Sequence, residues 1–109
     1  MEVFTLPPRY QAFLSRLDDD DCADIRNSEG AGAYFYGKNL LPERNETYAI
    51  AEDAPGCLLI GQDGDLGLFI LPGSDDTVYA LDLGALGTAP MQALAADIDA
   101  WLAQLGVQF

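Results

Sequence analysis

Aspartate supplies most of the side chains that could do chemistry in this 109-residue chain. The aspartates gather in three places: the run Asp18–Asp21 with Asp24 close behind, the pair Asp63 and Asp65, and the pair Asp75–Asp76. Neighbouring carboxylates can transfer protons, as in glycosidases, or bind cations. Histidine is absent, which removes the commonest general base and every nucleophile arrangement that depends on it.

The spacing of these aspartates fits no specific site. Counted from Asp63, the position that holds glutamate in an EF-hand calcium loop is Ser74, so that pattern fails. Gly61, Gly64 and Gly67 are spaced like a phosphate loop, but no Gly-Lys-Ser/Thr follows and the aspartates among them repel phosphate. We therefore expect no catalytic residue, no metal site and no cofactor, and we predict that the chain is not an enzyme.

Charge is the main clue to function. The net charge is −13, and it divides into about −3 for the first 44 residues and −10 for the remainder, which contains no basic residue after Arg44. A surface of one sign attracts partners of the opposite sign, and it repels nucleic acid, whose binders need basic grooves. We expect a protein partner with a basic surface, no nucleic acid and no membrane.

Aspartates and tyrosines are the candidate partner-binding residues. Tyr34 and Tyr36 share one face of a predicted strand, and an exposed tyrosine beside acids makes a good anchor for a partner. Trp101 lies on an apolar helix stripe and is expected in the core. The candidate residues are Asp18, Asp19, Asp20, Asp21, Asp24, Asp63, Asp65, Asp75, Asp76, Tyr34 and Tyr36.

The elements that position these residues can be read from hydrophobic periodicity. The spacing predicts a first helix over 8–17, with Pro8 at its start and Tyr10, Phe13, Leu14 and Leu17 on one apolar stripe. The aspartate run is expected to end this helix in an exposed loop. Further predictions are a strand at 33–37, a short helix from Pro42 to about Tyr48, strands at 57–61, 67–71 and 77–83, and a helix that begins near Thr88 and Pro90 and stops at Gly106.

Strands joined by short turns pair antiparallel, and two amphipathic helices can cover the sheet that they form. The predicted fold is α+β: a single antiparallel-rich sheet with an N-terminal and a C-terminal amphipathic helix packed on it. In the strand at 77–83, Tyr79, Leu81 and Leu83 share one face and Val78, Ala80 and Asp82 the other, which fits a sheet with one covered face and one wetter face. We expect one domain over 1–109, and no signal peptide or membrane span, which predicts a cytoplasmic protein.

The order of these motifs resembles the SUKH superfamily. Its opening is matched by Leu6–Leu14, and its later motifs by Tyr48, Asp53–Gly56, Leu59–Gly64, Leu68–Leu71, Val78–Asp82 and Asp99–Leu102. The resemblance covers most of the chain and leaves out residues 18–40. It implies a small α+β domain without catalytic residues.

Many members of that superfamily are bacterial immunity proteins of polymorphic toxin systems, and fungal relatives act in the regulation of cell-wall synthesis. The resemblance therefore implies a protein that binds and neutralises a toxin domain, often a nuclease, delivered by a neighbouring cell. Nucleases hold phosphates in basic clefts, which an acidic protein can occupy. The alternative is an intracellular interaction or regulatory module that binds a partner other than a toxin through a largely apolar interface.

Overall fold

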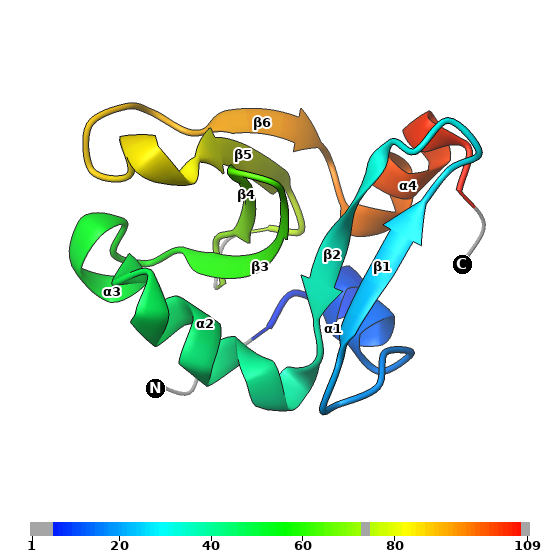
Figure 1. The fold of residues 1–109 in the computed structure, drawn as a ribbon, viewed down its shortest axis with the longest axis horizontal. Helices are drawn as coiled ribbons and strands as arrows, with labels where there is room; N and C mark the ends of the chain where they lie inside the picture. Colours follow the sequence, from blue (N-terminus) through cyan, green and yellow to red (C-terminus); the bar gives the residue numbers. More distant parts are fainter. Residues whose placement is uncertain (1–5, 73–74, 108–109) are drawn as a thin grey trace.

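A six-stranded antiparallel sheet organises the chain in the computed structural model, which describes residues 6–72 and 75–107. The strands pair in sequence order, so that β1 and β6 form the two edges. Their bounds are β1 Cys22–Arg26, β2 Gly32–Tyr36, β3 Leu58–Asp63, β4 Leu66–Ile70, β5 Val78–Asp82 and β6 Gln92–Ala95. The sheet is strongly twisted, and the β1–β2 hairpin runs across the direction of β3 and β6 (Figure 1).

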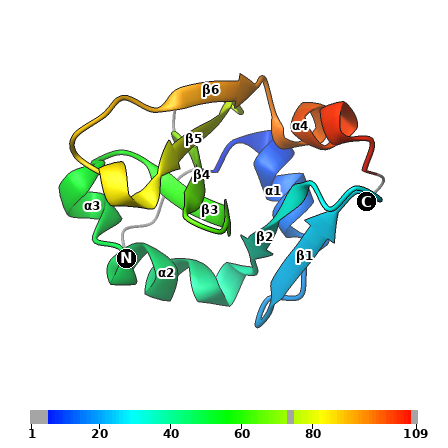
Figure 2. The same cartoon turned by 45° about the horizontal axis from the view of Figure 1, so that its top comes forward.

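Two helices at the ends of the chain pack together and against the sheet, as predicted. They are α1 (Pro8–Leu14) and α4 (Ile98–Leu105), and they lie side by side behind the β1–β2 hairpin (Figures 1 and 2). The remaining helical elements lie between β2 and β3 or after β5: η1 Lys38–Leu40, α2 Leu41–Thr47, α3 Ile50–Asp53 and η2 Leu83–Ala85. The predicted α+β class, with an N-terminal and a C-terminal helix on an antiparallel sheet, is confirmed.

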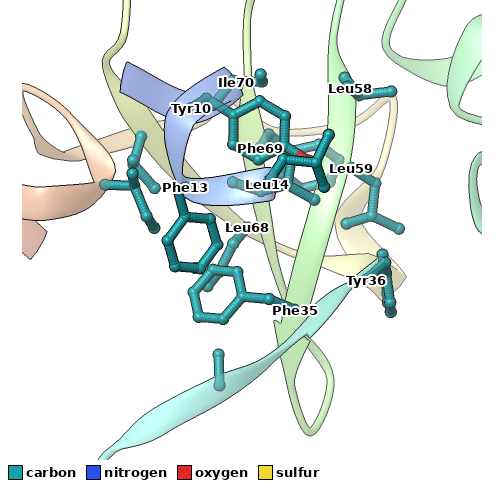
Figure 3. Close-up of a cluster of buried hydrophobic side chains, with 14 of the residues drawn as sticks. Tyr10, Phe13, Leu14, Phe35, Tyr36, Leu58, Leu59, Leu68, Phe69 and Ile70 are labelled. Atoms are coloured by element: carbon teal, nitrogen blue, oxygen red, sulfur yellow. The ribbon is translucent and has the colours of Figure 1, made fainter. Parts of the chain in front are cut away.

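The core forms where α1 and α4 meet β2. The ring of Phe35 packs edge-on against Phe13 of α1, with 5.1 Å between the ring centres (Figure 3). It also packs edge-on against Trp101 of α4, at 5.7 Å. The predicted stripe of α1 is confirmed, because Tyr10, Phe13, Leu14 and Leu17 are all buried. Trp101 packs on this core as expected, although its side chain is only half-buried.

Helix α2 packs beside β3. The pairing of β2 with β3 includes only Tyr34 with Gln62 and Phe35 with Gly61, so β3 continues beyond the end of β2. There the buried amide of Asn45 replaces a strand: its Oδ1 accepts from the backbone N–H of Leu59 at 2.8 Å, and its Nδ2 donates to the carbonyl of Leu59 at 3.0 Å. This side chain satisfies backbone groups that burial would otherwise leave without partners.

The first correction concerns β1. The predicted exposed loop ends sooner than expected, because Cys22–Arg26 form an edge strand that pairs along its length with β2. Ile25 is buried and Ala23 is half-buried, while Asp24 between them is exposed. Apolar and polar residues alternate in this segment, as is typical of a half-buried edge strand. The aspartate run directly before it favoured a loop, so the strand was not predicted.

The second correction concerns the C-terminal helix, which begins at Ile98 rather than near Thr88 and Pro90. Residues Gln92–Ala95 instead form β6 and pair with β5. Asp97 caps the helix, since its carboxylate accepts from the backbone N–H of Ala100 at 2.7 Å, and Gly106 ends it as predicted. Strand pairing here overrides the helical propensity of an alanine-rich and leucine-rich segment.

The third correction concerns the predicted wet face of β5. Val78 and Ala80 are buried, as is Leu81 on the other face, whereas Tyr79 is only half-buried. Residues on both faces of this strand are buried, so the expected alternation between a covered and a wetter face is wrong for β5.

Candidate partner-binding surface

The loop Asp18–Asp21 carries four exposed carboxylates and has a fixed backbone. The backbone N–H of Asn39 donates to the carbonyl of Asp19 at 2.8 Å, and the N–H of Gly37 donates to the carbonyl of Asp21 at 2.9 Å. The side chain of Asn39 also donates to Asp20 at 2.7 Å. These bonds hold the loop against the segment that follows β2.

Gly37 makes this close approach possible. A Cβ atom at this position would lie 2.0 Å from the backbone carbonyl oxygen of Asp18, which no side chain tolerates. Among the residues that the structure describes, no lysine or arginine lies within ion-pair distance of Asp18–Asp21. The predicted exposed acidic loop is therefore present, its backbone is fixed, and its carboxylates form no ion pair with any residue that the structure describes.

Three further predicted residues lie together, Asp24 and Tyr34 on the β1–β2 hairpin and Asp63 at the end of β3, and a cation lies among them. Asp24 faces Tyr34 in the strand register, and Tyr34 is 43% exposed. Arg26 contacts Asp24 at 2.6 Å and Asp63 at 3.3 Å, and its guanidinium lies 5.2 Å from the centre of the Tyr34 ring. The hydrogen bond to Asp24 is the main cause that raises the pKa of Arg26. Asp24 and Asp63 are thus partly neutralised, unlike the aspartates of the loop.

Tyr36 does not lie on the accessible surface, which corrects its expected role as an exposed anchor. It is 2% exposed, its hydroxyl donates to the Gln62 side chain, and the guanidinium of Arg44 lies 5.8 Å from its ring centre. Burial raises the pKa of Tyr36 well above its usual value. Tyr34 and Tyr36 do share a strand face, but α2 covers only the part of that face where Tyr36 lies.

The remaining predicted aspartates lie elsewhere and have local structural roles. Asp76 caps the start of α1, because its carboxylate accepts from the backbone N–H groups of Arg9 at 3.0 Å and Tyr10 at 3.2 Å. Asp75 accepts from the N–H of Thr77 at 3.0 Å, and the backbone carbonyl of Asp65 accepts from Leu83 at 2.7 Å. The structure does not bring these three residues into the acidic loop.

Two other arginines pair with acids where α1 meets α4. Arg9 lies 3.6 Å from Asp97 and 3.8 Å from Asp99, and Arg16 lies 3.4 Å from Asp99. These side chains are largely exposed apart from Asp97, so each pair contributes little to stability. The pairs do, however, neutralise the acids on this side of the molecule.

A groove of about 860 Å³ runs between α2, α3 and the segment that leads into β3. Buried Ile50 and Leu58 lie along it, with the carboxylates of Glu46 and Glu52, and Cys57 is its only thiol. Burial raises the pKa of the Cys57 thiol, which makes the thiol a poor nucleophile. No histidine lines the groove.

Within residues 6–72 and 75–107, no group of three or more histidine, cysteine, aspartate or glutamate side chains is arranged to hold a metal ion. No helix in the same ranges is both long enough and apolar enough to cross a membrane.

Two arginines of this surface were missed by sequence reasoning. Arg26 follows Asp24 at a spacing of two, which places both side chains on one face of a strand once β1 is known to be a strand. Arg44 has no sequence signal of its own, because its contact with Tyr36 depends on how α2 crosses the sheet.

No family model matches the chain, and no curated protein is significantly similar to it.

Proposed function

We propose that this protein is an immunity protein of the SUKH kind, which binds a toxin domain of the nuclease class and neutralises it. The proposed binding surface is the acidic edge, defined here as Asp18–Asp21 together with Asp24 and Tyr34. The proposal rests on the resemblance in motif order and on the electrostatics of this edge.

The observation that carries the proposal is the difference between the loop aspartates and the other acids. Asp18–Asp21 are exposed, fixed by backbone hydrogen bonds and without a cation in ion-pair range among the described residues. A fixed array of like charges loses little conformational freedom on binding, which favours affinity for a rigid basic surface. The field of such an array also accelerates association with a cationic partner.

A basic nuclease cleft is a physically suitable partner. Such a cleft holds the phosphates of its substrate with lysine and arginine side chains, and carboxylates in the same positions compete with the substrate. Tyr34 is 43% exposed at the centre of the hairpin face and supplies apolar area beside these charges. Occupation of the cleft blocks the nuclease without any chemistry on the part of this protein.

The test is rescue of cells by co-expression. The toxin is the C-terminal domain of the large secreted protein that we expect to be encoded beside this chain, expressed in cells that the domain alone kills. Wild-type protein should restore growth and bind the purified domain. A variant with all four of Asp18–Asp21 changed to Asn should raise the Kd about 10- to 100-fold, since each surface charge contributes a fraction of a kcal/mol.

The matched control changes four exposed acids of α2 and α3, as Glu43→Gln, Glu46→Gln, Glu52→Gln and Asp53→Asn. Both variants change the net charge equally, and the Asn side chains keep an oxygen that can accept the loop hydrogen bonds. If the control weakens binding as much as the loop variant, the acidic edge is not the binding surface. Absence of a neighbouring toxin gene, or failure of wild-type protein to rescue, contradicts the proposed function itself.

A further inference from the structure

Arg44 differs from the other arginines of the chain. Arg9, Arg16 and Arg26 each lie within 4 Å of at least one carboxylate. Arg44 is half-buried, forms no ion pair with any residue that the structure describes, and its buried Nε–H has no hydrogen-bond acceptor there. In a chain with 18 acidic residues, a cation without a carboxylate needs a physical explanation.

The sequence of α2 places no acidic residue where it could form an ion pair with Arg44. Side chains meet along a helix at spacings of three and four residues. Glu43 and Glu46 of α2 stand one and two positions away from Arg44 and are exposed on other faces. The positions three residues away are Leu41 and Thr47, which carry no charge.

The surroundings of Arg44 are aromatic. Its guanidinium lies 5.8 Å from the ring centre of Tyr36, whose hydroxyl is fixed by Gln62. Tyr48 follows α2 one helical turn later and is half-buried. A guanidinium held against a ring remains charged and keeps a planar set of donors, and these match the two oxygens of a carboxylate.

Arg44 also lies close to the acidic edge. Tyr36 pairs with Cys22 in the strand register, and the next residue along, Gly37, bonds to Asp21 of the acidic loop. The start of α2 and the start of β1 lie side by side in both views (Figures 1 and 2). The surface of a protein bound to the acidic edge would therefore lie near Arg44.

We propose that Arg44 is an anion-binding position beside the acidic edge and that it takes a carboxylate side chain of the partner. A cation without an acidic partner beside an anionic surface favours one orientation of the partner, because a partner shifted along the surface would place one of its own cations against Arg44. The identity of the partner rests on the proposed function, whereas the anion site itself does not.

The first test needs no partner and uses sodium acetate as the probe. Nitrogen-15 spectra of the arginine side chains are followed as acetate replaces chloride at constant ionic strength. The Arg44 Nε–H resonance should shift and saturate, while those of Arg9 and Arg16 should not. Equal responses of all three resonances would overturn the anion site.

The second test measures binding of the toxin domain from the rescue experiment to Arg44→Met, Arg44→Lys and Arg9→Met. Arg44→Met makes the protein more acidic, so net charge alone predicts tighter binding of a basic toxin. We expect about tenfold weaker binding instead, as for loss of one charged hydrogen-bonding partner. Arg9→Met makes the same change in charge beside Asp97 and Asp99, outside the acidic edge, and should not weaken binding.

Arg44→Lys keeps the charge without the planar donors, and we expect it to restore less than half of the lost binding energy. Thermal unfolding of each variant shows whether the fold is retained. Tighter or unchanged binding by Arg44→Met overturns the inference. If the four-asparagine loop variant still loses binding in that case, the proposed function stands and only the role of Arg44 fails.

Discussion

Aspartates lie both at the α1–α4 pair and at the acidic edge, but they differ in their partners: the first group caps helices and pairs with arginines, whereas most of the second group is exposed to solvent. At the helix pair, Asp76 and Asp97 cap helices, and Arg9 and Arg16 lie beside Asp97 and Asp99. At the acidic edge, the loop carboxylates face solvent, and only Asp24 has a cation beside it among the described residues. The first group holds the fold together, and the second remains available for a partner.

This difference shows why net charge alone does not locate a binding surface. The sequence contains 18 acidic residues, but the fold assigns several to helix termini and ion pairs. Charges that are already satisfied contribute weakly to the field felt by a partner. The informative acids are those that the fold fixes in place and leaves without a counter-charge.

The largest expected effect comes from removing a cap at the helix pair. Asp76→Ala leaves the backbone N–H groups of Arg9 and Tyr10 without their acceptor, and we expect it to lower the free energy of unfolding by about 1–2 kcal/mol. Asp21→Ala removes a carboxylate from the acidic edge and should change that energy by less than about 0.5 kcal/mol. Urea unfolding of both variants measures the contrast, and equal losses would contradict it.

An effect of similar size is expected at high pH, and it arises from two buried tyrosines, Tyr10 of α1 and Tyr36 beside Arg44 of α2, rather than from the exposed acids. Burial raises the pKa of Tyr10 and of Tyr36 above the ordinary value near 10. Above that pH the unfolded chain releases protons that the folded protein retains, so stability is complete below pH 10 and falls as the pH rises. The loss is about 1 kcal/mol per tyrosine between pH 10 and 11.

Tyr10→Phe separates this effect from general alkaline damage. The Tyr10 hydroxyl is buried without a hydrogen-bond partner among the described residues, so its removal should not destabilise the protein at neutral pH and should reduce the alkaline loss by about half. Thermal melts at neutral pH and at pH 11 measure both effects. An alkaline loss that is identical in Tyr10→Phe and wild type would show that Tyr10 does not contribute.

The smallest expected effect is on the stability of the acidic edge itself. Changing all four of Asp18–Asp21 to Asn relieves repulsion among like charges, and stability should rise slightly or remain within about 0.5 kcal/mol of wild type at low salt. A loss of more than 1 kcal/mol would mean that the loop carboxylates hold the fold in the way that Asp76 does.

Much of the fold could be predicted because local patterns and tertiary packing agree. The stripe of α1, the proline at its start and the strands β3, β4 and β5 all follow from periodicity and turn residues. In these segments, most of the apolar residues are buried. Their predicted bounds differ from the observed ones by a few residues at most.

The errors arose where tertiary contacts overrode a local pattern. Gln92–Ala95 has a composition typical of a helix but pairs with β5, and β1 lies directly after an aspartate run that favours a loop. The burial of Tyr36 depends on α2 crossing one end of the hairpin, which strand periodicity does not show. The sequence predicted the acidic residues of the candidate site but not its arginines, because the positions of Arg26 and Arg44 depend on tertiary packing.

The most direct test of the account is the salt dependence of toxin-domain binding, measured for wild type and for the two four-residue variants. The Kd of wild type should rise steeply between low and high salt, since exposed charges are screened over about 8–10 Å at physiological ionic strength. The variant of Asp18–Asp21 should lose most of this dependence, whereas the variant of α2 and α3 should keep it. A Kd that is indifferent to salt, or equal salt dependence in the two variants, would contradict the account.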